Sequence, residues 1–517
     1  MLRMLGNCWL QRWGLGCTSA LMPFKDQVIA QYFWLSHLMD AIPIEARRLA
    51  HQADKMHVFV QSANEWLDCY IKDTIKRHVP EAIFYDDFDD FPENADNTIQ
   101  ICNGWHLNPH FVALNKSDKG LLNAYPSSDG VSRKDHLARA IEYWTTKRPK
   151  STLNDHWPLT VRLSLDYAEY VDDSLAAADD LSLMYSLEDN EDKDPADREW
   201  WILKPALIDC GAGIRIFSTQ DELADCLELA ESDDEEEEDS EGETATPEDK
   251  EPGMPFNFNV PGLDQLDGLV TATGKLKVGT DLDSNQKWLM DETERIPSAS
   301  MRMFVAQRYI VSIPPIEGRK WHVRAYVMSL GRLKVYVYKE LLTLLAVEKY
   351  QPPWTNPGLK SSLTNTSLQD SDEVAEMESM RSWDSIPDDL LPGDWKTSVF
   401  DQICKISGEI LQAAAHTMAD KFTPLDRCFE LFAVDFLVDT NANAWLLEVN
   451  ETPAFYQHGV AGPLSKRVME SVMSRAMEHI GYSGPEEQDE VRSRLVEVLD
   501  ETQGLGKSNI TMIMPEK

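Results

Sequence analysis

The sequence predicts an α+β protein whose N-terminal part is an α/β domain. Residues 56–80 form a pattern of a short apolar strand, a turn and an amphipathic helix, which is the usual opening of an α/β domain. Residues 395–420 repeat apolar residues at helical spacing. Residues 429–450 contain two apolar runs on either side of the polar turn Thr-Asn-Ala-Asn, which is typical of a β-hairpin.

The predicted hairpin carries three polar side chains among apolar neighbours. Asp435 lies in the first run, and Glu448 and Asn450 lie in the second. Because side chains alternate along a strand, Glu448 and Asn450 share one face, and Asp435 can lie opposite them. A carboxylate among apolar residues is paired, metal-bound or neutralised. Two carboxylates and an amide oxygen therefore predict a Mg²⁺ site of the kind that substrate phosphates complete.

This hairpin, with the sequence LLEVNETPAF, resembles the metal-binding end of the tubulin-tyrosine ligase-like family, which is a branch of the ATP-grasp ligases. The resemblance covers about 56–480 and implies an ATP-grasp fold, in which two α+β lobes clamp ATP. Five parts are expected along the chain: an N-terminal extension at 1–55, an N-terminal α/β domain at 56–197, a central ATP-grasp lobe at 198–347 with a disordered acidic insertion at 231–296, a C-terminal ATP-grasp lobe at 348–482 and a C-terminal tail at 483–517.

Composition and charge limit the classes of partner. With 517 residues, of which 43% are hydrophobic, the chain has room for two or three domains. Its eight cysteines form no CxxC pair and no zinc-like cluster, which favours a reducing compartment. The net charge is −39, and residues 231–252 contribute −12 (13 acids and one lysine), so −39 + 12 leaves −27 elsewhere. Nucleic-acid binding needs a basic surface, so no direct nucleic-acid partner is expected.

The N-terminal extension carries no site chemistry. It has Arg3, Arg12 and Lys25 and no acid before Asp26, which is only weakly similar to a mitochondrial transit peptide. It is short of serine and shows no basic amphipathic face. Because no run of 18 apolar residues occurs in the chain, no membrane span is expected either. We expect a cytoplasmic protein, and the resemblance to fungal members adds the P-body as a location.

The stretch after residue 198 is expected to hold the phosphates. EWWILKP is an apolar strand that ends at Lys204 and Pro205, and a turn with Gly211 and Gly213 leads into Ile214. A lysine at a strand end is usually a surface residue. In the family, however, this KP and GxGI pattern forms a glycine hairpin whose N–H groups close on the triphosphate, with the lysine offsetting its charge. The acidic run that follows is the expected disordered insertion.

The next strand leads into Gln307, Arg308, Tyr309 and Ile310. In the family this stretch is the hinge that holds adenine, and an exposed strand edge offers the N–H and C=O pair that a purine needs. A plain core strand is the alternative for Tyr309 and Ile310.

Lys320, His322 and Arg324 then share one face of a strand by alternation. Three such groups in a row predict an anion above them. The family's usual stripe is K-F-D-x-R, so His322 replaces an aspartate here. The resemblance implies that Lys320 reaches the γ-phosphate and Arg324 the phosphate or the acceptor carboxylate.

Two further positions concern the acceptor. An arginine that holds the substrate carboxylate in tubulin-modifying members aligns with Thr343, and no arginine occurs between Arg332 and Arg381. The stretch SSLTNTSLQ matches the family's LTNxxIQ and would place Thr364 and Asn365 beside the acceptor, although a polar turn has the same composition. Tubulin is therefore disfavoured as the acceptor, while ATP chemistry is retained.

The implied enzyme is an ATP-dependent amino-acid ligase. It would use ATP and Mg²⁺ to activate a carboxylate as an acylphosphate and pass it to an amine of an amino acid, protein or peptide. Two alternatives stay open: an ATP-binding interaction protein with weak or lost transfer, and an RNA-granule (P-body) component in which the acidic run binds a partner.

Overall fold

The computed structural model describes residues 55–62, 64–92, 97–102, 119–208, 211–230, 291, 293–355, 358–364 and 377–502. The part from Met56 onward forms one compact unit. The predicted extension, most of the acidic insertion and the end of the tail lie outside the described residues. Among the helices of the described part, none is long and apolar enough to cross a membrane.

An N-terminal sheet opens the fold. Its strands are β1 (His57–Gln61), β2 (Ile83–Tyr85), β3 (Asn97–Cys102) and β4 (Lys119–Asn123), all parallel and ordered β2-β1-β3-β4. Helix α4 (Glu65–His78) connects β1 to β2 and buries Leu67, Ile71 and Ile75. This strand-helix-strand unit is the α/β opening expected from residues 56–80.

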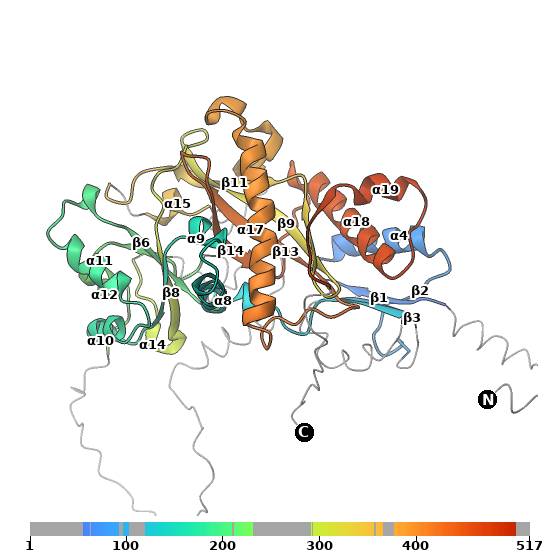
Figure 1. Cartoon of the computed structure of the whole chain (residues 1–517), viewed down its shortest axis with the longest axis horizontal. Helices are drawn as coiled ribbons and strands as arrows, with labels where there is room; N and C mark the ends of the chain where they lie inside the picture. The colour runs from blue at the N-terminus through green and yellow to red at the C-terminus, as the bar shows by residue number, and fades with distance from the viewer. Residues whose placement is uncertain are drawn as a thin grey trace, which may run out of the picture. The chain divides into compact units, whose positions relative to one another are not determined.

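A small antiparallel sheet follows in the order β5-β8-β6-β7. It consists of β5 (Thr160–Ser164), β8 (Met303–Arg308), β6 (Trp201–Pro205) and β7 (Arg215–Phe217). Strand β5 comes from the stretch assigned to the N-terminal domain, yet it pairs with β8. Helices α10 (Val171–Ala176), α11 (Ser182–Asn190), α12 (Gln220–Asp225) and α14 (Ser298–Met301) accompany this sheet (Figure 1).

The chain after the acidic run becomes ordered earlier than predicted. Ile296 was assigned to the disordered insertion, but it is fully buried in the core beneath the small antiparallel sheet. Its N–H donates to the carbonyl of Cys226 at 2.9 Å. The apolar side chain therefore fixes the return of the chain to the fold before residue 297.

A large sheet forms the rest of the molecule. Its long central strand β9 (Arg319–Leu330) pairs antiparallel with β10 (Lys334–Tyr338), β11 (Leu342–Lys349) and β13 (Phe429–Val438). Strands β12 (Met380–Ser382), β14 (Ala444–Asn450) and β15 (Leu495–Asp500) extend it. The sequence predicted only a tail at 483–517. This stretch instead contains helix α19 (Glu487–Arg492) and strand β15, which pairs with β10.

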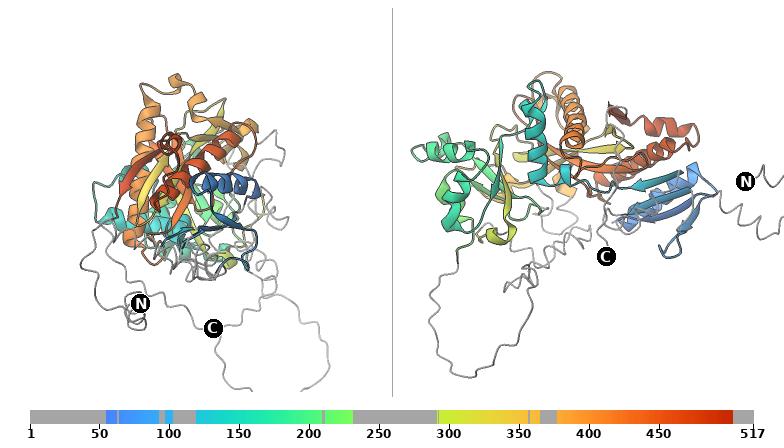
Figure 2. Two further views of the ribbon diagram at one scale, coloured as in Figure 1. Left: turned by 90° about the vertical axis from the view of Figure 1, so that its right-hand side faces the viewer. Right: turned by 60° about the horizontal axis from the view of Figure 1, so that its bottom comes forward.

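The two faces of the large sheet are covered differently. Helix α17 (Trp395–Thr417), predicted at 395–420, lies across one face with α8 (Lys134–Thr146), and Val323 and Phe436 point into the core there (Figure 1). On the opposite face, α18 (Ala461–His479) packs with α4 over Tyr326 and Met328. The right panel of Figure 2 shows the N-terminal sheet beside α18. This second face continues past the helices into the candidate site.

Candidate functional site

A cavity lies between the small antiparallel sheet and the uncovered end of the large sheet. Its empty volume is about 700 Å³ with the open space at its mouth included. The lining residues come from both sheets and from the segment that contains α15 (Leu359–Ser362): Ile202, Lys204, Ile214, Gln307, Arg308, Tyr309, Ile310, Lys320, His322, Ser362, Leu363, Thr364, Asp435, Leu437, Leu447 and Glu448.

Lys204 lies near the end of β6 and is buried in this cavity, with 7% of its surface exposed. Its Nζ donates to Oε1 of Gln307 on β8 at 2.8 Å. Burial lowers the pKa of Lys204 to about 8, although Glu448 acts to raise it. The predicted strand-end lysine is therefore not a surface residue, because its charge is held away from water.

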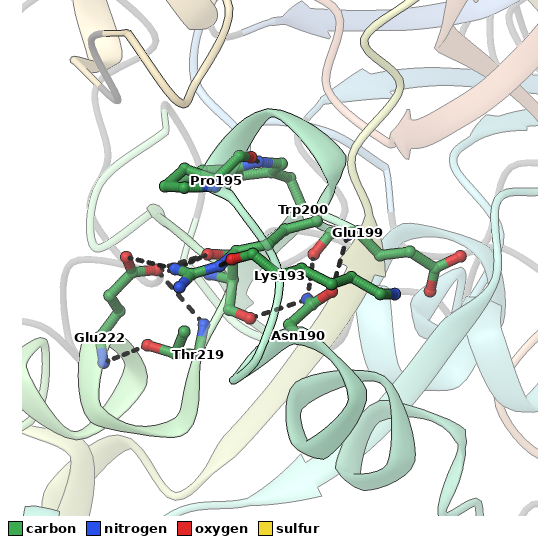
Figure 3. A network of polar contacts seen from close by, with 9 residues as sticks. Asn190, Lys193, Pro195, Glu199, Trp200, Thr219 and Glu222 are labelled. Atoms are coloured by element: carbon green, nitrogen blue, oxygen red, sulfur yellow. Dashed lines mark hydrogen bonds and ion pairs between the residues drawn. The ribbon is translucent and has the colours of Figure 1, made fainter.

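A polar network fixes the start of the strand that carries Lys204 (Figure 3). Asn190, at the end of α11, donates its side-chain N–H groups to the carbonyls of Glu199 at 2.8 Å and Ser218 at 2.9 Å. It also accepts the N–H of Glu199 at 3.0 Å. Thr219 caps α12 in a reciprocal capping box with Glu222. These bonds tie the outer ends of β6 and β7 together and so hold the lysine strand in place.

The predicted glycine turn joins β6 to β7. Gly211 and Gly213 have φ of 79° and 70°, a region that glycine adopts readily. A Cβ on Gly213 would lie 2.9 Å from Cγ of Pro205, so no larger residue fits there. Neither glycine lines the cavity, whereas Ile214 does. The glycines thus lie in a turn as expected and Ile214 forms part of the wall, while the contact of the turn with phosphates stays a prediction.

Lys320 on β9 lines the same cavity as Lys204 and is also 7% exposed. Its Nζ lies 3.8 Å from the centroid of the Tyr309 ring, which is a cation–π contact. Burial lowers the pKa of Lys320 to about 7. Two lysines with pKa values depressed by burial in one cavity form a place where bound anionic charge is strongly favoured.

The adenine prediction needs one correction. Strand β8 is not an exposed edge, because β5 borders it on one side and β6 on the other. Gln307 uses its amide to bind Lys204 and Thr160, and the N–H of Tyr309 donates to the carbonyl of Trp200 at 2.8 Å. The chain leaves the sheet only after Arg308, which forms an ion pair with Glu199 at 2.9 Å. Tyr309 and Ile310, which line the cavity, are the part of the predicted hinge beyond the strand.

The hairpin acids come together as the sequence predicted. Asp435 lies directly opposite Glu448 in the β13–β14 ladder, and Ala433 lies opposite Asn450, so all three polar residues share one face. Asn450 Nδ2 is 3.4 Å from Oδ2 of Asp435. The Asp435 side chain is only 4% exposed.

Asp435 also forms a bidentate ion pair with Arg324, which lies opposite it on β9. Arg324 Nε is 2.9 Å from Oδ1, and a second guanidinium nitrogen is 2.9 Å from Oδ2. Burial acts to raise the pKa of Asp435, but Arg324 and His322 outweigh burial and hold the pKa below its usual value. Arg324 was expected to contact phosphate or the acceptor, yet here it contacts Asp435, the carboxylate predicted to hold the metal.

A β-bulge completes this wall. The β13–β14 register shifts after Asp435, so Phe436 pairs with Leu446 and Leu447 is the extra residue. Leu447 and Glu448 both line the cavity as a result, although they are adjacent in the sequence. Strict alternation could not have predicted this arrangement.

His322 lies between the cations of β9 and is buried. Its Nδ1 is hydrogen-bonded to Oγ1 of Thr364 at 2.5 Å, and its Nε2 is 3.6 Å from Oδ2 of Asp435. Burial lowers the pKa of His322 to about 4, so the ring is neutral near pH 7. Thr364 therefore belongs to the cavity wall, while its predicted partner Asn365 lies outside the described residues.

The structure also changes the prediction that Thr343 stands where an arginine would hold the carboxylate of the acceptor. Thr343 lies opposite Val323 on β9, and Val323 faces the core beneath α17 rather than the cavity. Leu342 and Leu344 of β11 lie opposite Arg324 and His322 on β9, but neither lines the cavity. Although β11 ends at Lys349, this part of the strand carries no cation, and the position that decides this is not Thr343.

Two contributors were missed by sequence analysis. Lys134, at the start of α8, is 8% exposed, donates from Nζ to the carbonyl of Ile208 at 2.9 Å, and lowers the pKa of Lys204. Leu359 and Leu363 pack in one apolar cluster with Trp200 and Ile202 of the small antiparallel sheet. Both contacts join segments that are remote in sequence, and no local pattern marks them.

The donor set fits a hard cation completed by phosphate. Within the described ranges, no three His, Cys, Asp or Glu side chains already form a metal-binding group. Asp435, Glu448 and Asn450 supply oxygen atoms on one face, and a carboxylate that accepts a bidentate arginine retains lone pairs. Because Mg²⁺ commonly takes only one or two protein carboxylates plus phosphates, this set is adequate for a nucleotide-bound cation.

Comparisons with known proteins point to one family. The model of the tubulin-tyrosine ligase family matches residues 113–489. A protein of Schizosaccharomyces pombe named as a probable tubulin–tyrosine ligase is 35% identical over 340 residues, covering 66% of this chain and 72% of that protein. Saccharomyces cerevisiae PBY1, which carries the same description, is 31% identical over 347 residues, covering 65% of this chain and 40% of that protein.

A solved structure resembles the whole fold. The C-terminal domain of K. lactis Pby1, described as an ATP-grasp enzyme that interacts with the mRNA decapping enzyme Dcp2, aligns with a TM-score of 0.55 and 23% identity. The alignment covers 86% of this chain and 99% of that domain. The predicted ATP-grasp fold is confirmed by this likeness.

Proposed function

The chain belongs to the tubulin-tyrosine ligase family of ATP-grasp ligases, and from that premise we propose that it joins a carboxylate to an amine at the expense of ATP. The observation that carries this proposal is that two buried lysines, Lys204 and Lys320, line the same cavity as Asp435 and Glu448. Buried cations without an anion are costly, and a triphosphate would supply that anion.

Different side chains of the cavity bind the phosphates, the base and the cation. Lys204 and Lys320 hold the transferring phosphoryl group through charge-assisted hydrogen bonds. Tyr309 and Ile310, with Ile202 and Leu447, provide an apolar slot for the base. Asp435, Glu448 and Asn450 hold the cation. When bound, Mg²⁺ neutralises charge on the β- and γ-phosphates.

The reaction balances without a protein nucleophile. A carboxylate oxygen of one substrate bonds to the γ-phosphorus, and the bond from that phosphorus to the β–γ bridging oxygen breaks to release ADP. The amine of the other substrate bonds to the acyl carbon, phosphate leaves with the electron pair of the C–O bond, and the nitrogen loses a proton. Catalysis then consists of positioning and charge stabilisation.

Trapping of the activated carboxylate tests this proposal. The full chain is incubated with ATP, Mg²⁺ and panels of amino acids and peptides, with hydroxylamine present to convert an acylphosphate to a hydroxamate. We expect substrate-dependent ADP and hydroxamate from the parent protein, and their loss in Lys320→Met. Lys405→Met, which changes an exposed lysine on α17, is the matched control. A hydroxamate yield equal in the parent and Lys320→Met would contradict the proposal.

A second function is a role in protein interaction with weak or lost transfer. The solved relative from K. lactis is described as interacting with Dcp2, and in this chain Arg324 is bound to Asp435 rather than facing the cavity. We propose that decapping components in P-bodies of the cytoplasm are the partners in this case. Binding of purified Dcp2 to the full chain, compared with and without AMP-PNP, tests it, and no measurable association in either state would exclude it.

A further inference from the structure

His322 presents a buried nitrogen atom to the cavity. Its side chain is 5% exposed, and Nε2 has no hydrogen-bond partner within the described part of the chain. Asp435 Oδ2 is the nearby acceptor, but at 3.6 Å it is beyond hydrogen-bonding distance. A buried polar atom without a partner destabilises a fold, so its retention in a lined cavity points to a ligand.

The other ring nitrogen, Nδ1, has a partner. It is hydrogen-bonded to Oγ1 of Thr364, and a histidine that binds a metal usually donates its second ring N–H to a neighbouring acceptor. Two ligands at ~2.1 Å from one cation lie ~3.0–3.4 Å apart for octahedral to tetrahedral angles. The observed separation of 3.6 Å between Nε2 and Oδ2 is close to this range.

We propose that His322 is a nitrogen ligand of the cation that accompanies the nucleotide, and that it biases this site from Mg²⁺ toward Mn²⁺. The inference rests on the proposed function, because the nucleotide phosphates must complete the coordination. Mg²⁺ strongly prefers oxygen ligands, whereas first-row transition ions accept imidazole. The aspartate usual at this position in the resembling family would add oxygen instead, so the substitution changes the donor set.

The alternative is that Nε2 simply donates to a phosphate oxygen. In that arrangement His322 would affect nucleotide affinity equally with either cation. Ligation instead changes the ratio of the two cation affinities. It also places a histidine nitrogen within magnetic coupling distance of Mn²⁺. These two readouts separate the roles without any measurement of turnover.

The experiment uses the full chain labelled with ¹⁵N-histidine and loaded with Mn²⁺ and AMP-PNP. Electron–nuclear double resonance detects coupling of Mn²⁺ to nitrogen, and titrations give dissociation constants for Mn²⁺ and Mg²⁺. The variants are His322→Gln, which removes the imidazole, and His322→Asp, which offers oxygen. His416→Gln is the matched control, because His416 contacts Glu501 on the outside of α17 rather than the cavity.

We expect ¹⁵N coupling in the parent protein and in His416→Gln, and its loss in both His322 variants. We also expect the preference for Mn²⁺ over Mg²⁺ to fall by ~10-fold in His322→Asp, as losses of single metal-site groups do. Bound Mn²⁺ without ¹⁵N coupling, or coupling that survives in His322→Gln, would overturn the inference and leave the proposed function standing. Failure of both AMP-PNP and Mn²⁺ to bind would overturn the two together.

Discussion

Nucleotide binding should draw protons from solution at neutral and mildly alkaline pH. Burial lowers the pKa of Lys204 to about 8 and that of Lys320 to about 7. Around these pH values part of each lysine population is uncharged in the free protein. A triphosphate beside both lysines raises both pKa values again, because nearby negative charge favours the ammonium form. Binding therefore shifts each lysine to the protonated state.

The size of the uptake follows from the two pKa values. At pH 8, Lys204 is about half protonated and Lys320 about one-tenth, so complete protonation takes up ~0.5 + 0.9 = 1.4 protons. At pH 7 the corresponding fractions are about nine-tenths and one-half, and the uptake is ~0.1 + 0.5 = 0.6 protons. The uptake should thus rise with pH across this window, whereas deprotonation of the nucleotide phosphate on binding would release protons instead of taking them up.

Isothermal titration calorimetry measures this uptake. AMP-PNP and Mg²⁺ are titrated into the protein in buffers of different ionisation enthalpy, and the slope of heat against that enthalpy gives the protons exchanged. Lys320→Arg and Lys204→Arg keep a cation that stays charged, so at pH 8 they should remove ~0.9 and ~0.5 protons of uptake, respectively. Heats that do not depend on the buffer, or uptake unchanged by both variants, would refute the assignment of these lysines to the phosphates.

Three further predictions concern the metal, the insertion and the acceptor. Glu448→Gln should reduce ATP turnover at least tenfold, which corresponds to about 1.4 kcal/mol in the transition state, and should leave the melting temperature unchanged. Equal turnover in the variant and the parent protein would show that Glu448 is not a ligand of the cation. Deleting residues 231–252 should leave the melting temperature nearly unchanged, because a solvated run of acids buries little apolar surface. A fall in the melting temperature of ~5 °C or more, which corresponds to more than about 1 kcal/mol in the free energy of unfolding, would show that the run packs on the fold. Detyrosinated tubulin should be a poor acceptor of labelled tyrosine or glutamate, since a net charge of −27 remains outside the acidic run and β11 places Leu342 and Leu344, not a cation, opposite Arg324 and His322. Loss of one arginine contact to a carboxylate costs ~1.5–3 kcal/mol, or roughly tenfold to hundredfold in affinity, so robust incorporation that weakens as salt rises would contradict this expectation.

Local pattern was enough to predict the elements that carry the acids and cations. Alternation placed Glu448 with Asn450 and set Asp435 opposite them, and the ladder confirms this pairing. The stripe of Lys320, His322 and Arg324 shares the cavity-side face of β9 as predicted, because a buried strand keeps a strict period of two. The helix expected at 395–420 was correct to within three residues.

The sequence alone could not predict which residues contact each other when they are far apart along the chain. Whether Arg324 contacts Asp435 or the cavity depends on the β9–β13 register, which no local signal fixes. Strand β8 has no free edge because it lies between β5 and β6, and this order is a property of the sheet topology rather than of the local sequence. Lys134 and Leu363 reach the site from segments whose patterns show only helix and turn.

The extra residue in β14, Leu447, separates the size of the apolar wall of the cavity from the positions of its two carboxylates. Leu446 opposes Phe436 and Glu448 opposes Asp435, so removal of Leu447 would leave both pairs intact. In a ladder without an extra residue, removal of one residue would instead slip the register by one place and exchange the two faces of the strand. The chain can therefore enlarge or reduce the apolar wall at Leu447 over evolutionary time without moving the carboxylates. A related protein could therefore change its nucleotide or acceptor by a substitution at Leu447 and keep Asp435 and Glu448 in place.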